Sequence, residues 1–255
     1  MATYKKRGYK PKTKAERKDA IEEQSKTAEV FNTLDEGASK TEQWVIKNQK
    51  LIFGIIGVVA IVVLGYLGYN KFLQEPKEID AKNDMFQAQK HFDEAVNATE
   101  KDSLFNLALN GSEGQFGMLD IISNHGSTDA GNLANYYAGM SYLNLKDYEN
   151  AIRYLGDFSS GDDILGPLAQ GGIGDAFIQL NQPEDAYDYY VKAAEMKTND
   201  FTTPQYLFKA GNVALQLGNY SEALKFFERI KDEFSSSTEA SNVDVFIGKA
   251  RAASN

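Results

Sequence analysis

The sequence predicts an all-α protein in which one N-terminal transmembrane helix precedes a series of helical repeats. Two observations lead to this fold class. Residues 51–69 form a run without any charged side chain, long enough to cross a bilayer as a helix. From residue 132 onward, short phrases of small, acidic and aromatic residues recur at a nearly fixed interval, which is typical of repeated helical hairpins.

The uncharged run, LIFGIIGVVAIVVLGYLGY, would span about 29 Å as an α-helix, close to the hydrocarbon thickness of a bilayer. Its flanks carry the lysines and aromatic residues that favour membrane interfaces, so we assign residues 44–73 to the transmembrane helix. A cleaved signal peptide is the alternative. The long preceding region and the lack of an A-x-A site favour an uncleaved signal anchor.

The distribution of charge predicts the orientation of this helix. Residues 1–50 hold 12 Lys and Arg against 8 Asp and Glu, whereas residues 71–255 hold 15 against 28. Lys and Arg keep a flank in the cytoplasm, and acidic domains cross membranes readily. We therefore expect a single-pass protein of a bacterial inner membrane, with its N-terminus in the cytoplasm and its C-terminal domain in the periplasm.

Residues 1–43 are expected to form a basic, largely disordered cytoplasmic tail, in which residues 19–43 serve mainly as a tether and could form a weak amphipathic helix. Residues 1–18 alone contain eight Lys and Arg and one acidic residue. This segment could contact a ribosome or anionic lipid. It could also serve only to fix the topology, and we favour this interpretation because a positive flank is needed in any case.

Glycines gather on one face of the transmembrane helix. Gly54, Gly57, Gly65 and Gly68 fall within about 80° of the helix circumference. Such a face lets another helix approach closely, although glycine is also common in membrane helices generally. The sequence leaves open whether the partner helix belongs to a second copy or to a different protein.

The repeats cover residues 130–255, and residues 74–129 are expected to form degenerate helical pairs, with helices over 78–98, 101–109 and 117–122. Each of three phrases, KDYENAIRYL, QPEDAYDYY and GNYSEALKFF, pairs an alanine with a large apolar residue four positions later. A glycine stands twelve residues before each alanine. The positions that recur at intervals of 35 and 37 residues are Gly139, Tyr142, Ala151 and Leu155, then Gly174, Phe177, Ala186 and Tyr190, then Gly211, Ala214, Ala223 and Phe227.

These residues resemble the tetratricopeptide repeat, a 34-residue unit of two antiparallel helices. The resemblance implies that the glycines and alanines lie where the two helices of a unit cross, with the aromatic residues filling the space between them. The usual tryptophan of the first helix and the usual closing proline are absent. Residues 238–253 look like a lone first helix that caps the stack, with Gly248 standing 37 residues after Gly211.

The same resemblance implies a concave groove, lined by the first helix of each unit, that binds extended or helical segments. The groove positions of the family correspond here to Leu133, Tyr136, Met140, Asn144, Asp175, Ile178, Gln179, Phe208, Asn212, Leu215 and Gln216. Their amide and apolar groups suit backbone hydrogen bonds with loose side-chain contact. Packing against a neighbouring helix explains the apolar members at least as well.

No arrangement of residues in the sequence points to catalysis. The chain has no cysteine and two histidines, His91 and His125, which we expect to be surface or packing residues. The glycines at 171–174 lie at repeat-packing positions, so a phosphate-binding loop is not needed to explain them. We therefore expect a protein that is not an enzyme and that needs no metal and no cofactor.

The whole architecture, and the run GNLANYYAGMSYLNLKDYENAIRYL at 131–155 in particular, resembles the Bacteroidetes-type ancillary subunit family of the bacterial SecYEG translocon. The resemblance implies a scaffold at the Sec channel, beside a membrane-anchored periplasmic chaperone and in contact with emerging secretory chains. The residues by themselves indicate an anchored interaction scaffold. A self-associating scaffold for envelope or cell-division proteins is the alternative.

Overall fold

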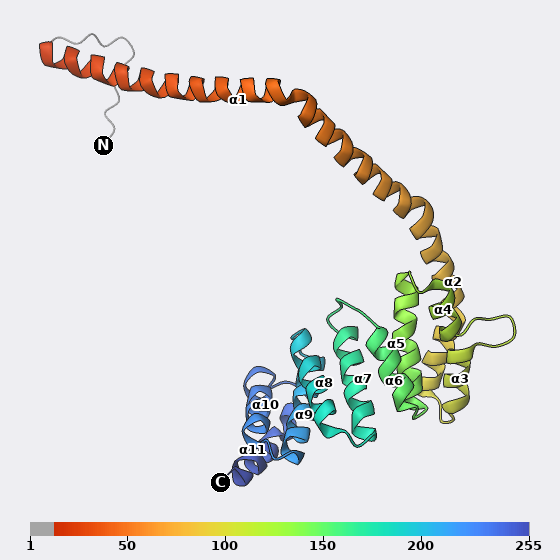
Figure 1. Cartoon of the computed structure of the whole chain (residues 1–255). Helices are drawn as coiled ribbons and strands as arrows, with labels where there is room; N and C mark the ends of the chain where they lie inside the picture. The colour runs from red at the N-terminus through yellow and green to blue at the C-terminus, as the bar shows by residue number, and fades with distance from the viewer. Residues whose placement is uncertain (1–12, 255) are drawn as a thin grey trace. The chain divides into compact units, whose positions relative to one another are not determined.

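The computed structural model describes residues 13–254 and divides into two compact units, which meet between Tyr69 and Asn70. Within the described residues the structure is helical throughout, apart from turns and one isolated bridge between Ser112 and Gln115 (Figure 1). The predicted all-α fold class is confirmed.

The first unit contains one long helix, α1 (Lys14–Tyr69). Residues 14–43 belong to this helix, so the weak amphipathic helix considered for residues 19–43 describes this segment better than a disordered tail. No proline stands between Pro11 and Pro76, and alanine, glutamate and lysine are frequent in this segment. A helix can therefore extend backward from the apolar run without a new nucleation step. Residues 1–12 lie outside the described part of the chain.

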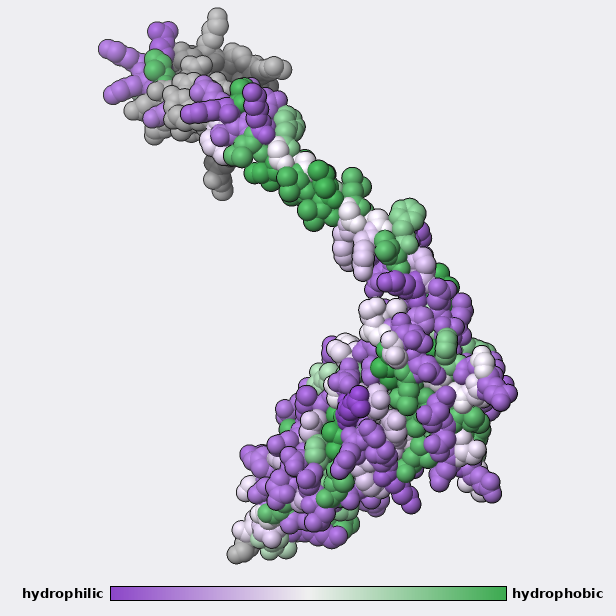
Figure 2. Space-filling view, turned by 45° about the vertical axis from the view of Figure 1, so that its right-hand side comes forward, coloured by the Kyte–Doolittle hydropathy of each residue, from purple (hydrophilic) through white to green (hydrophobic). Residues whose placement is uncertain are grey.

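The apolar run lies in the C-terminal part of α1 and is visible as a continuous hydrophobic band in Figure 2. Its most apolar window has a mean hydropathy of 2.7, and none of it is buried. Among the described residues, this is the one helix long and apolar enough to cross a membrane. A core helix of a soluble protein would be mostly buried, so the exposure is consistent with a single-pass membrane anchor.

The second unit begins with a π-helical turn, η1 (Asn70–Gln74), which leads directly into α2 (Glu75–Asn97). Pro76 has no N–H to donate to the carbonyl one turn earlier, and a wider turn just before it accommodates this loss. The predicted transmembrane segment, 44–73, therefore crosses from α1 into η1. The boundary between the two units falls at the same place.

Helices α2, α3 (Asp102–Asn110) and α4 (Met118–His125) occupy the region where degenerate pairs were expected. α2 packs against α3, α4 and α5. One stripe of α2 is buried in these contacts, and its members, spaced by three or four residues, are Ala81, Met85, Ala88, Phe92 and Ala95. The Glu78 carboxylate also accepts hydrogen bonds from the first backbone N–H groups of α5, at Asp129 and Ala130.

Three helix pairs follow, and each helix packs against the next one along the chain (Figure 1). The pairs are α5 (Asp129–Asn144) with α6 (Tyr148–Asp157), α7 (Leu165–Gln179) with α8 (Pro183–Met196), and α9 (Thr202–Gln216) with α10 (Tyr220–Glu233). A short 3₁₀ turn, η2 (Glu239–Asn242), then leads to α11 (Val243–Ala253).

The same turn closes the first helix of every pair. Lys146, Asn181 and Gly218 occupy equivalent positions and adopt left-handed backbone conformations, with φ of 65°, 58° and 79°. In each turn the following residue donates its N–H to a carbonyl five residues earlier, as Gln182 does to Phe177. This is the Schellman arrangement, and it sends all three second helices back along the first in the same way.

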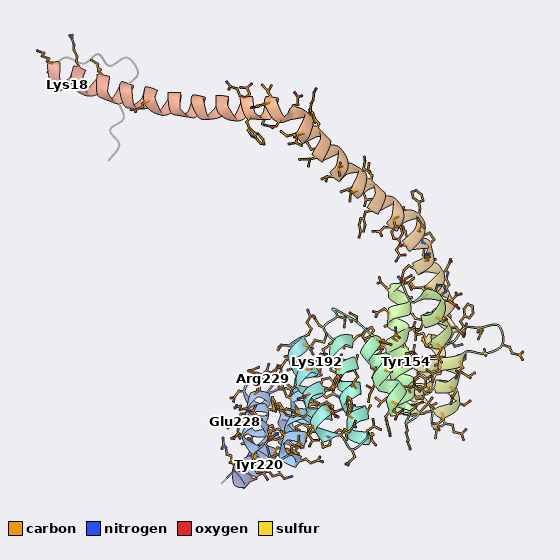
Figure 3. The ribbon with its side chains drawn as sticks, viewed as in Figure 1. Lys18, Tyr154, Lys192, Tyr220, Glu228 and Arg229 are labelled. Carbon is orange, nitrogen blue, oxygen red and sulfur yellow. The ribbon has the colours of Figure 1, made fainter. Side chains whose placement is uncertain are left out.

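The last helix, α11, ends the stack with a polar side. Asp244 pairs with Lys231 of α10 at 2.7 Å, and Arg251 pairs with Glu228, labelled in Figure 3, at 2.6 Å. A Cβ atom added at Gly248 would meet no neighbouring atom within 4 Å. In the three pairs, the position equivalent to Gly248 is covered by the second helix. On α11 it is open, and Asp244 and Arg251 stand one turn before and after it.

Candidate interaction surface

Each helix pair has a glycine where its two helices approach most closely. A Cβ atom added to Gly139 would lie 2.5 Å from the Leu155 side chain. A Cβ atom added to Gly174 would lie 2.7 Å from the Tyr190 ring, and one added to Gly211 would lie 2.6 Å from the Phe227 ring. No larger side chain fits these seams unless a buried neighbour moves, so the glycines set how closely the helices of a pair approach each other.

The alanines and aromatic residues of the repeat fill the same seams. Ala151, Ala186 and Ala223 are fully buried. Tyr142 stacks on Tyr154 with ring centroids 5.4 Å apart, and Phe177 stacks on Tyr189 at 5.3 Å. In the third pair, the position equivalent to Tyr142 and Phe177 is Ala214, which has no ring to stack. The aromatic residue of α10, Phe226, instead lies 6.1 Å from Tyr187 of the preceding pair.

The apolar residues assigned to the groove take part in packing between helices. Tyr136 is only 8% exposed, and its ring lies 5.3 Å from that of Phe158. The ring of Phe208 lies 4.7 Å from that of Phe246 in α11. The remaining members pack, half-buried, against the cores of neighbouring helices: Leu133, Met140, Ile178 and Leu215.

The amides at the ends of the first helices are more accessible. Asn144, Gln179 and Gln216 occupy one equivalent position on α5, α7 and α9, and all three are exposed. We call these three residues the amide row. The remaining amide of the predicted groove, Asn212, is half-buried and donates to the backbone carbonyl of Phe208. The amide row is therefore the most exposed part of the predicted groove. Within it, Asn144 donates to the Met140 carbonyl and Gln179 accepts from the Tyr148 hydroxyl at 3.4 Å.

Asp175, also predicted to line the groove, belongs to a cluster of charged and aromatic groups. Its carboxylate accepts hydrogen bonds from Lys209 of α9 at 2.6 and 2.8 Å and from the Tyr190 hydroxyl at 2.6 Å. The Lys209 ammonium also lies 5.4 Å from the ring centroid of Tyr190 and 5.6 Å from that of Tyr206. This cluster joins α7, α8 and α9 and so fixes adjacent repeats to each other.

Burial raises the pKa of three tyrosines in this part of the stack. The pKa of Tyr136 rises to about 12, chiefly because the phenol is removed from water and secondly because Tyr137 is close. The pKa values of Tyr190 and Tyr206 also rise, because of burial first and then because of the Asp175 carboxylate. All three phenols are therefore neutral at physiological pH.

Lys209 and Tyr206 were not among the residues selected from the sequence. The ring of Tyr206 occupies the space beside Gly171, where an added Cβ would lie 1.9 Å from the ring. Lys209 could have been found from its spacing, because it stands 34 positions after Asp175, close to one repeat length, and so could face it from the next repeat. The repeat pattern did not single out either residue, because both lie outside the positions that recur in all three units.

The four glycines of the apolar run and the two histidines lie elsewhere. A Cβ atom at Gly54, Gly57, Gly65 or Gly68 would meet no atom within 4 Å. The His125 imidazole lies 2.9 Å from the Asp84 carboxylate and links α4 to α2. The His91 side chain is mostly buried. Among the side chains that the structure describes, no three His, Asp or Glu gather in a way that could hold a metal ion.

Comparison with known families agrees with the three helix pairs. Models described as the tetratricopeptide repeat match residues 133–160, 169–200 and 205–237. No curated protein matches the sequence. Proteins with such repeats are generally non-catalytic scaffolds for protein interaction. The second unit of this chain therefore contains tetratricopeptide repeats, carried by the pairs α5–α6, α7–α8 and α9–α10.

Proposed function

We propose that this chain is a non-catalytic scaffold, anchored in a bacterial inner membrane by the apolar part of α1, with its repeats in the periplasm. The observation that carries the proposal is the combination of an exposed apolar helix with repeats that present accessible amides. The acidic balance of residues 71–255 against the basic balance of residues 1–50 supports the orientation.

The amide row suits recognition of an extended polypeptide. A carboxamide both donates and accepts hydrogen bonds, so it can pair with backbone N–H and C=O groups of any sequence. Packed helices lie about 8–10 Å apart, and three residues of an extended chain span about 10 Å. The row offers one amide on each of α5, α7 and α9, so an extended chain that follows the stack can meet one amide per repeat. Because the row carries no charge, its contribution to binding is expected to depend little on salt.

Site-specific photo-crosslinking in living cells tests this surface. A photoreactive residue at Gln179 or Gln216 is expected to crosslink to the same partner chains. Lys192, exposed on the second helix α8 and labelled in Figure 3, is the matched control. Equal crosslinking from Lys192 and Gln179 would show that the amide row has no special role in binding.

We further propose that the partner is the SecYEG translocon, together with a membrane-anchored periplasmic chaperone and the secretory chains that emerge beside it. The resemblance of residues 131–155 and of the whole architecture to translocon ancillary subunits supports this role. Pull-down from mild detergent is expected to recover translocon subunits in fixed proportion to the chain. Recovery of none of them would remove the translocon from the proposal and leave the anchored scaffold.

The glycine face of the apolar run supports a second candidate, a self-associating scaffold for envelope or cell-division proteins. Four glycines on one side of α1 have open space around them, so a second α1 could approach closely. Crosslinking within the membrane that yields only self-contacts would favour this candidate.

The proposed contact of residues 1–18 with ribosomes or anionic lipid falls largely outside the described residues. Deleting residues 2–18 and measuring ribosome co-sedimentation tests it.

A further inference from the structure

The first helices of the three repeats are almost free of charge, unlike the second helices. Each of α5, α7 and α9 contains one charged residue, and these are Asp129, Asp175 and Lys209. The second helices α6, α8 and α10 contain three, five and seven charged residues. Helices at a protein surface normally carry charged residues on the side away from the core, so the uncharged first helices need an explanation.

Asp129 lies at the start of α5, so two charges remain along these helices, and they neutralise each other. The Lys209 ammonium donates to both carboxylate oxygens of Asp175, at 2.6 and 2.8 Å. The Tyr190 hydroxyl donates to the same carboxylate at 2.6 Å, and the rings of Tyr190 and Tyr206 lie 5.4 and 5.6 Å from the ammonium. Both charges therefore have their partners within the chain itself.

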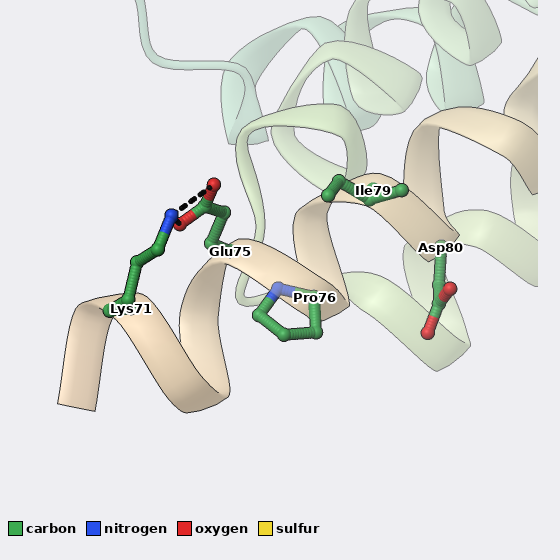
Figure 4. Close-up of a pocket in the computed structure, with 5 residues that line it drawn as sticks. All are labelled: Lys71, Glu75, Pro76, Ile79 and Asp80. Atoms are coloured by element: carbon green, nitrogen blue, oxygen red, sulfur yellow. Dashed lines mark hydrogen bonds and ion pairs between the residues drawn. The ribbon is translucent and has the colours of Figure 1, made fainter. Parts of the chain in front are cut away.

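An ordinary surface ion pair of the same unit shows the contrast. Figure 4 shows Lys71 and Glu75, whose charged groups lie 2.7 Å apart beside a shallow pocket. Their side chains are 68% and 49% exposed, so water and ions reach both. The side chains of Lys209 and Asp175 are only 32% and 37% exposed and come from different repeats. A molecule that lies on the first helices therefore meets a closed, neutral pair rather than two accessible charges.

The neutral surface extends over α5, α7 and α9 and ends at α11. That last helix contains three charged residues, Asp244, Lys249 and Arg251. The three helices before it also carry the amide row, and they stand out in a part of the chain that is strongly acidic. Residues 71–255 hold 15 Lys and Arg against 28 Asp and Glu. The acidic excess of the unit therefore lies away from the predicted groove.

The charge of a polypeptide decides whether it gains by lying on this surface. Backbone groups and uncharged polar side chains can pair with the carboxamides of the amide row. A charged side chain on the same surface would lose part of its hydration and find no free opposite charge. An acidic chain would in addition be repelled by the net negative charge of the unit, over about 8 Å at physiological salt.

We therefore propose that the repeats select extended polypeptide segments without charged side chains, and that the Asp175–Lys209 pair sets this selectivity. By neutralising each other, the two residues keep the middle of the surface free of net charge. Loss of either partner would uncover the other and shift the preference toward chains of the opposite charge. The inference rests on the proposed function, because it names the class of chain that the scaffold binds.

Three synthetic peptides test the proposal on the full-length chain in phosphatidylcholine nanodiscs. Each peptide consists of Asn, Gln, Ser, Thr, Leu and Val, has blocked termini and is long enough to span the three repeats. The peptides differ only in the central residue, which is Asn, Asp or Lys. Surface plasmon resonance, with empty nanodiscs as the reference, measures binding. The Asn peptide is expected to bind most tightly, and the Asp and Lys peptides about fivefold more weakly.

Single substitutions of the pair are expected to change this order in opposite ways. Asp175→Asn frees the Lys209 ammonium, so the Asp peptide should gain about threefold relative to the Asn peptide. Lys209→Gln frees the Asp175 carboxylate, so the Lys peptide should gain by a similar factor. The double variant should restore the order seen with the natural chain. Asp188→Asn and Lys192→Gln make the same charge changes at exposed positions of α8 and should leave the order unchanged.

Each contrary result has a distinct meaning. Equal binding of the three peptides by the natural chain would overturn the selectivity and leave the anchored scaffold in place. An unchanged order in both single variants, with unchanged helical circular dichroism, would refute the role of the pair. Equal shifts in the α8 controls would assign the effect to the net charge of the unit instead. Binding of none of the peptides would contradict recognition of extended chains itself, and this inference would fall with it.

Discussion

Replacement of glycine by alanine is expected to change the free energy of unfolding in opposite directions at two equivalent repeat positions. Gly211 and Gly248 stand at the same position of their repeats. A Cβ atom at Gly211 would lie 2.6 Å from the ring of Phe227, which is fully buried beside Phe208 and Phe246. A Cβ atom at Gly248 would meet nothing within 4 Å. Gly211→Ala and Gly248→Ala therefore differ in packing but share the same change of residue.

The expected magnitudes follow from two opposing effects. Alanine is favoured over glycine inside a helix by about 0.8–1.0 kcal/mol, and this gain applies to both variants. Overpacking of a closed core costs about 1–3 kcal/mol, and this cost applies only at Gly211. We expect Gly248→Ala to raise the free energy of unfolding by up to ~1 kcal/mol and Gly211→Ala to lower it by up to ~2 kcal/mol.

Urea unfolding of residues 70–255, followed by circular dichroism, measures this difference. These residues form one compact unit, and the single tryptophan, Trp44, lies outside them, so helical signal is a better probe than tryptophan fluorescence. The midpoints of the two variants are expected to move in opposite directions with similar slopes. A shift of both midpoints by the same amount in the same direction would refute the reasoning that the ring of Phe227 closes this seam.

Three further predictions concern the repeats. Burial raises the pKa of Tyr136 from 10.0 to about 12, so its contribution to stability is complete below pH 10 and is lost as the pH rises to 12. The loss amounts to about 2.7 kcal/mol, and Tyr136→Phe should reduce the alkaline slope of stability in urea titrations. Lys146→Gly should stabilise the fold by about 1 kcal/mol, because glycine adopts the left-handed conformation of this position without strain, and Gly218→Ala should destabilise it by about the same amount. The thermal midpoints should rise and fall accordingly. Asp175→Ala should cost about 1–3 kcal/mol by leaving Lys209 and the bound tyrosine hydroxyl without an acceptor, and Asp175→Asn should cost less in the same unfolding assay.

The repeats could be predicted because their determinants are local and recur. The spacing from Gly139 to Ala151, repeated twice more, indicated two helices that cross closely, and the structure places Leu155 in that seam. The turns were also readable, since Asn181 and Gly218 are residue types that tolerate a left-handed conformation. Lys146 adopts the same conformation although lysine rarely does, because the repeat geometry requires it there.

Two features could not be read from the sequence because they depend on contacts between units or on context. The helical form of residues 14–43 was indicated only weakly, as a possible amphipathic helix over 19–43, since a polar segment with few apolar residues gives little periodic signal. The contact of Lys209 with Asp175 joins adjacent repeats and depends on their relative orientation, which the period does not specify. The packing of Tyr136 and Phe208 between helices, in contrast, is the alternative that the sequence had left open for the apolar groove positions.

A single-cysteine topology measurement tests the proposed anchorage most directly. Lys18→Cys places a thiol in the N-terminal part of α1, and Ser221→Cys places one at an exposed position of α10. An impermeant maleimide is applied to spheroplasts before and after lysis. If the repeats lie outside the cytoplasm, Ser221→Cys is expected to react in intact spheroplasts and Lys18→Cys only after lysis. The reverse pattern, or equal labelling of both variants before lysis, would contradict a single membrane span with the repeats outside.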